Sequence, residues 1–124
     1  MKKREDNIVY IKSFSFAVKI VELYKTLCED RREFVLSRQL LKAGTSIGAN
    51  IREAIEGQSK KDFIAKLSIA LKETNEAEYW IELLKETAYI KTTDAEELLH
   101  DAMEIHRLLT AIIKSMKEKS SIND

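Results

Sequence analysis

The sequence contains no proline, three glycines and one cysteine among its 124 residues. Proline breaks helices, and glycine costs a helix interior up to about 1 kcal/mol relative to alanine. Their scarcity predicts a helical protein and argues against a sheet-rich fold, which needs more turn residues. The lone Cys28 cannot form an intramolecular disulfide, and we interpret it as a small buried hydrophobe rather than a reactive thiol.

Net charge and long apolar runs are also absent. Lysine and arginine number 21, and aspartate and glutamate number 21, so the formal net charge is zero. Proteins that bind nucleic acid usually carry a surplus of positive charge, and the composition gives no such signal. No uncharged apolar stretch of about 18 residues occurs, and no apolar segment follows the basic start of the chain. We therefore expect no membrane partner and a cytoplasmic location.

Capping patterns and apolar spacing predict four helices. Ser13, Ser59 and Thr93 are suitable N-cap residues for the first, third and fourth helices. We expect the helices to cover about 13–30, 33–57, 59–89 and 93–117. Short connections make consecutive helices antiparallel, so the expected fold is all-α, one up-down-up-down four-helix bundle. Residues 1–12 and 118–124 are expected to form a poorly ordered arm and tail.

The third helix has more apolar surface than one bundle core can cover. Its main apolar stripe faces the core, while Ile69, Trp80 and Leu83 project from the opposite side, beside Glu73 and Glu76. The first helix likewise has a broad apolar arc. Exposed apolar patches usually mark interaction sites, so we expect these two helices to form a subunit interface. The alternative is a surface tryptophan that is shielded by its own neighbours.

Two glycines lie four residues apart in the second helix, at Gly44 and Gly48. Their cost to a helix indicates the close approach of another helix. A phosphate-binding loop is the competing interpretation, but it needs a lysine directly after the second glycine, and Ala49 lies there. Ser46, Asn50 and Glu53 share a flank next to the core, where we expect them to fix helix register. Carboxylates such as Glu53 beside an apolar surface also occur as acid–base or metal groups, and that alternative stays open.

One motif is typical of a di-iron site in a helical bundle. Glu97 and His100 form a Glu-x-x-His on the fourth helix. Such a site needs a second copy on another helix, and the only other histidine, His106, follows Met103 by three residues. We therefore expect no metal, no cofactor and no catalytic residue.

The central sequence is similar to that of one family. The run from Gln39 to Ala54 reads QLLKAGTSIGANIREA, 62–73 reads DFIAKLSIALKE, and 76–80 reads EAEYW. These segments resemble the four-helix-bundle proteins encoded in intervening sequences of bacterial 23S ribosomal RNA genes. The resemblance covers nearly the whole chain and implies a four-helix bundle, a homopentamer and no known catalytic residue. A related branch, the accessory proteins of diversity-generating retroelements, is basic and binds nucleic acid, whereas this chain is neutral.

We expect a non-enzymatic, self-associating interaction module. RNA or a ribonucleoprotein is the most concrete further partner, provided that Arg31, Arg32, Lys60 and Lys61 gather on one rim of the assembly. The alternative is a protein scaffold without a nucleic-acid role.

Overall fold

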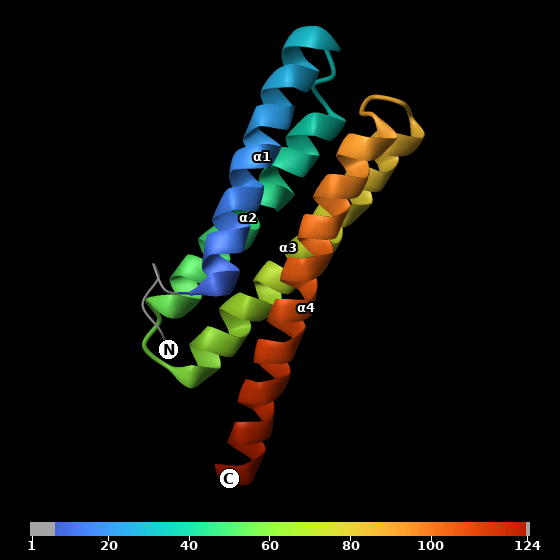
Figure 1. Cartoon of the computed structure of the whole chain (residues 1–124). Helices are drawn as coiled ribbons and strands as arrows, with labels where there is room; N and C mark the ends of the chain where they lie inside the picture. Colours follow the sequence, from blue (N-terminus) through green and yellow to red (C-terminus); the bar gives the residue numbers. More distant parts are fainter. Residues whose placement is uncertain (1–6, 124) are drawn as a thin grey trace.

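The structure is a computed structural model, which describes the backbone of residues 7–123 and the side chains of residues 7–119. Its helices are α1 (Ile8–Asp30), α2 (Leu36–Ile55), α3 (Lys60–Glu86) and α4 (Thr92–Asn123). They run alternately up and down, and the last turns of α4 extend past the rest of the bundle (Figure 1). The predicted all-α four-helix fold is confirmed.

One apolar core joins all four helices. α1 packs against α2 and α4, and α3 packs against the same two helices on its own side. The larger side chains that lie almost wholly inside are Phe16, Ile20, Leu27, Leu40, Ile47, Ile51, Leu67, Ile81, Leu84, Ile105 and Leu109. Near the end of α4, Ile113 is buried while Ile112 is only partly covered. A straight helix drifts away from a strict seven-residue repeat, which explains this change of register.

α1 begins earlier than the sequence predicted. Its N-cap is Asn7, whose side-chain oxygen accepts a hydrogen bond from the amide of Tyr10 at 3.0 Å. Ser13, the predicted cap, is buried inside the helix, and its hydroxyl donates to the Tyr10 carbonyl at 2.7 Å. Residues 8–12 are therefore helical rather than part of a loose arm, because the apolar period already begins at Ile8.

α2 begins three residues later than predicted, because Glu33 acts on the start of the helix from outside it. The Glu33 carboxylate accepts hydrogen bonds from the amides of Val35, Leu36 and Ser37 at 3.1, 2.8 and 2.8 Å. The first amides of a helix have no partner within the helix, and this carboxylate satisfies three of them. Glu33 is only 8% exposed, so the charge is held in place by these bonds.

The other two helix starts differ from each other. Ser59 caps α3 as expected, since its hydroxyl oxygen accepts from the Asp62 amide at 3.0 Å. α4 begins at Thr92, one residue before the predicted cap Thr93, and continues to Asn123. The predicted tail from residue 118 is thus helical as far as the structure describes it.

Gly44 and Gly48 lie where α1 crosses α2. A Cβ atom added to Gly44 would be 2.9 Å from Cγ1 of Ile20, and one added to Gly48 would be 3.2 Å from Oγ of Ser13. The two backbones approach closely because neither glycine carries a side chain. Because Ser13 and Ile20 must face α2 at this contact, the opposite side of α1 is turned outward.

Candidate interaction surfaces

The predicted subunit-interface residues share one face of α3. Ile69 is 42% exposed and Glu76 is also exposed. Glu73, Trp80 and Leu83 are half-buried. The spacing of three and four residues keeps all five side chains on the same side of the helix. The face is apolar at both ends and acidic in the middle.

Trp80 contains an unsatisfied polar group. Its indole ring meets the Tyr79 ring edge-on, with centroids 5.0 Å apart and an interplanar angle of 77°. The Nε1 donor is buried, and no hydrogen-bond acceptor reaches it among the described residues. Leaving a buried donor unpaired costs about 1–3 kcal/mol. Half-buried aromatic rings of this kind are enriched in interfaces between proteins.

The acidic part of this face is held in an unfavourable environment. Burial raises the pKa of Glu73 above its ordinary value, and the neighbouring charge of Glu76 raises it further. Lys72 and Lys42 act in the opposite direction without cancelling the effect. A partner that offered a positive or hydrogen-bonding group would stabilise the charged form of Glu73.

α1 presents a second apolar surface. Ile8, Ile11, Phe14 and Val18 are 59%, 50%, 58% and 47% exposed. Their spacing places them along the side of α1 opposite its buried residues. We call these four residues the α1 stripe. The predicted apolar arc of the first helix did not include Ile8 and Ile11, because the helix was predicted to begin at Ser13. An N-cap predicted at Asn7 would have placed Ile8 and Ile11 inside the helix.

The polar residues next to the glycines bond within their own helix. The Ser46 hydroxyl donates to the Lys42 carbonyl at 2.6 Å, and the Asn50 side-chain amide donates to the Ser46 carbonyl at 2.8 Å. Glu53 is exposed, and its nearest cation is Lys66 Nζ at 4.0 Å. Among the described residues, only this long ion pair links Ser46, Asn50 and Glu53 to another helix.

The predicted basic residues lie at opposite ends of the bundle. Arg31 and Arg32 follow α1, whereas Lys60 and Lys61 begin α3, and α2 with its 20 residues separates them by about 30 Å (Figure 1). A single rim within one subunit therefore cannot hold all four residues. We call the two regions the Arg31 end and the Lys60 end.

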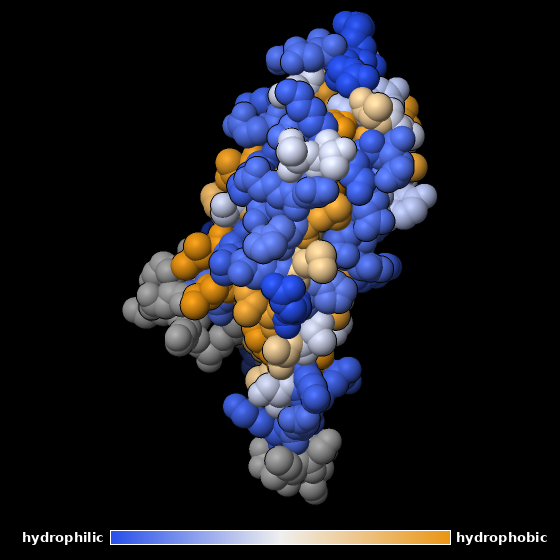
Figure 2. Space-filling model, turned by 45° about the vertical axis from the view of Figure 1, so that its right-hand side comes forward, coloured by the Kyte–Doolittle hydropathy of each residue, from blue (hydrophilic) through white to orange (hydrophobic). Residues whose placement is uncertain are grey.

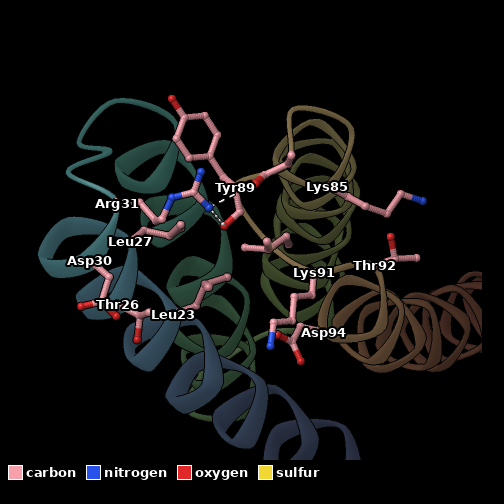
Figure 3. Close-up of a pocket in the computed structure, with 12 residues that line it drawn as sticks. Leu23, Thr26, Leu27, Asp30, Arg31, Lys85, Tyr89, Lys91, Thr92 and Asp94 are labelled. Carbon is pink, nitrogen blue, oxygen red and sulfur yellow. Dashed lines mark hydrogen bonds between the residues drawn. The ribbon is translucent and has the colours of Figure 1, made fainter.

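Arg31 is hydrogen-bonded to the turn between α3 and α4. Its guanidinium Nη1 donates to the carbonyls of Ala88 and Tyr89, both at 3.1 Å, and its Cζ lies 5.0 Å from the centre of the Tyr89 ring. A cavity of about 500 Å³ lies beside these contacts. Figure 3 shows that Arg31, Lys85 and Lys91 surround it together with Asp30 and Asp94. This hollow therefore contains charges of both signs, three cations and two carboxylates.

The histidines do not form a metal site with other described residues. His100 is exposed, and Glu97 contacts Lys19 Nζ at 3.2 Å instead. His106 Nδ1 lies 3.4 Å from Oε1 of Glu78, and this oxygen accepts no hydrogen bond from the described residues. Within residues 7–119, no three acidic, histidine or cysteine side chains are grouped so that they could hold a metal ion.

Comparison with known proteins identifies the family. The family model of the 23S rRNA-intervening sequence protein matches residues 5–111. The chain belongs to this family. A solved structure from Bacteroides thetaiotaomicron, described as a protein with unknown function from the S23 ribosomal protein family, is 57% identical. It has a TM-score of 0.85, and the match covers 86% of this chain and 99% of that one. No curated protein matches the chain.

The family match includes the α3 face, the α1 stripe and both basic pairs, but it ends just before Ile112. The last turns of α4, with Met116 and Lys119, lie outside it. None of the described helices is long and apolar enough to cross a membrane.

Proposed function

We propose that this family member is a non-enzymatic, homo-oligomeric interaction module whose subunits meet through α1 and α3. The observation that carries the proposal is the α3 face, where Ile69 is 42% exposed and the buried Nε1 of Trp80 has no described partner. A second subunit would cover the apolar surface and could offer that donor an acceptor.

The location of the two surfaces favours a ring. The α1 stripe and the α3 face lie on helices that α2 and α4 separate. Two different surfaces that meet each other make a head-to-tail contact, and such contacts close into rings when the rotation allows it. The number of five subunits rests on the family resemblance alone.

Sedimentation velocity tests the proposed interface. We expect the wild type to be oligomeric and Ile69→Lys to shift it to smaller species, because a lysine in an apolar contact loses its hydration without a partner. Met103→Lys is the matched control, since Met103 is 51% exposed on α4, away from both surfaces. Trp80→Ala should weaken association by about 2 kcal/mol or more per subunit. A monomeric wild type, or equal effects of Ile69→Lys and Met103→Lys, would contradict the proposal.

RNA binding is a second candidate, supported by one observation at the Lys60 end. No ion pair to Lys60 or Lys61 is found among the described residues, whereas the Arg31 guanidinium is already bonded to two carbonyls. Repetition of such a pair around an oligomer would add many weak phosphate contacts.

Gel shifts across a salt series test this second candidate. We expect binding at low salt that falls steeply as salt rises, with a larger loss in Lys60→Gln/Lys61→Gln than in Arg31→Gln/Arg32→Gln. The absence of a shift at low salt would leave a protein scaffold without a nucleic-acid role.

A further inference from the structure

The Lys60 end contains an apolar groove to which no function has been given. It has a volume of about 720 Å³ and lies where the start of α1, the end of α2, the start of α3 and the second half of α4 meet. The described residues that line it are Asn7, Ile8, Val9, Ala54, Ile55, Gly57, Gln58, Ser59, Lys60, Phe63, Leu108, Ile112, Met116 and Lys119. Pockets for small ligands span about 300–1,000 Å³ and are mainly apolar with a few polar groups, as this groove is.

The apolar wall of the groove comes from side chains that the core leaves partly uncovered. Phe63, Leu108 and Ile112 are only half-buried although they touch the core. Met116 continues the same wall along the part of α4 that extends past the bundle. Figure 2 shows apolar side chains gathered beside the lower part of α4 and toward the start of α1. A ligand with an apolar chain would remove this surface from water.

The charges of the groove have one sign. Lys60 and Lys119 are the only charged residues among the described ones that line it, and the described part of the chain provides neither with an ion pair. The hollow at the Arg31 end, by contrast, includes Asp30 and Asp94.

We propose that the groove at the Lys60 end binds a small anionic amphiphile of the long-chain carboxylate class. The chain lies along Phe63, Ile112 and Met116, and the carboxylate lies between the ammonium groups of Lys60 and Lys119. The positive charge of the two lysines and the apolar wall beside them together match an anionic head group joined to an apolar chain. This inference shares Ile8 with the proposed subunit interface but does not depend on the α3 face.

Isothermal titration of the full-length protein tests the proposal, with dodecanoate below its micelle concentration as the probe. Dodecyltrimethylammonium, which has the same chain and a cationic head, serves as the matched ligand. We expect one dodecanoate per chain and an affinity about tenfold or more above that of the cationic probe, a difference of about 1.4 kcal/mol. Equal affinities, or no binding of dodecanoate, would overturn the proposal.

Paired variants locate the site. Met116→Glu should abolish binding, because it places a negative charge inside the groove, while Ser115→Glu, on an exposed neighbouring position, should leave it unchanged. Lys60→Gln/Lys119→Gln should weaken binding about fivefold, and Lys61→Gln should not. Circular dichroism checks that each variant is folded. Equal effects within either pair would contradict the location.

A truncated chain tests whether the start of the protein itself occupies the groove. If dodecanoate binds only after residues 2–6 are removed, the start of the chain fills the groove and the proposal is wrong. Sedimentation of the same samples separates this outcome from the proposed function. Loss of the oligomer in Ile69→Lys with dodecanoate binding retained would leave the groove proposal standing.

Discussion

The two ends of the bundle differ in how their turns are stabilised and in what surface they leave exposed. At the Arg31 end, side chains satisfy the turns, since Glu33 accepts three amides and Arg31 donates to two carbonyls. At the Lys60 end, Ser59 caps α3 in a similar way, but the side chains around this turn leave an apolar groove with two lysines. Although the net charge of the chain is zero, the two hollows differ: the one at the Arg31 end is lined by charges of both signs, and the groove at the Lys60 end only by positive charges among its described residues.

The Arg31 end also contains strained backbone. Arg32 and Ala88 have φ angles of 52° and 63°, in the left-handed region that favours glycine, and they are the only such residues in the described chain. The hydrogen bonds around them stabilise this conformation. The Arg31 end is thus held in a fixed geometry, whereas the Lys60 end leaves room for a ligand.

Glu33→Ala should have the largest effect on stability. The change leaves three amides at the start of α2 without their acceptor, and we expect a loss of about 2 kcal/mol in the free energy of unfolding. Glu29→Ala, at an exposed position near the end of α1, is the control and should change stability by less than about 0.5 kcal/mol. Urea unfolding measures both. Equal losses would show that α2 does not depend on this cap.

The same carboxylate should make stability depend on pH. Burial raises the pKa of Glu33, but the hydrogen bonds from Ser37, Leu36 and Val35 together outweigh burial and hold the pKa below its ordinary value of 4.5. Because the folded pKa lies below the unfolded one, the stabilisation is complete above pH 4.5 and is lost as pH falls through the folded pKa. Glu33→Gln should therefore lose less stability on acidification than the wild type. Parallel curves from pH 7 to 3 would contradict this.

Arg31→Lys should cost about 1 kcal/mol. Lysine keeps the charge but cannot donate from one planar group to two carbonyls while lying over the Tyr89 ring. Thermal unfolding measures the loss. Lys25→Arg on the exposed side of α1 is the reverse exchange and should be neutral. If Arg31→Lys is also neutral, the fixed geometry of this end does not depend on the guanidinium.

Ala88→Gly should raise stability by about 0.5 kcal/mol. Glycine adopts a positive φ without steric cost, and this gain exceeds the extra entropy of the unfolded glycine by a small margin. Ala111→Gly, at an exposed helical position, should instead lower stability by about 1 kcal/mol. Opposite signs in urea unfolding would place the strain at the turn, and a loss in both variants would contradict it.

Contacts between residues close in the sequence could be predicted only in part, and contacts between separate helices could not be predicted. Ser59 was predicted correctly because its cap acts on an amide three residues away. Glu33 was missed because a glutamate at a helix start looks like part of the helix, although its carboxylate reaches forward to the amides of Val35 to Ser37. The groove could not be predicted at all, since Ile8, Ile55, Phe63 and Met116 meet only when four separate elements are packed.

The candidate surfaces follow the same rule. The position of Ile69, Trp80 and Leu83 on one helix face is a matter of local spacing, and the structure places them together. That Arg31 and Lys60 lie about 30 Å apart follows only from the direction of α2 and its 20 residues. Sequence spacing alone therefore could not test whether the basic pairs share a rim.

The smallest expected effect is at the Lys60 end, where Lys60→Gln/Lys119→Gln should change the free energy of unfolding by less than about 0.5 kcal/mol. Neither lysine has an ion pair among the described residues, so removing the two charges breaks no contact there. The variant should nevertheless lose affinity for dodecanoate. A side chain that contributes to binding and not to stability serves a ligand rather than the fold. If urea unfolding instead shows a loss near that of Arg31→Lys, these lysines stabilise the bundle, and the contrast between the two ends fails.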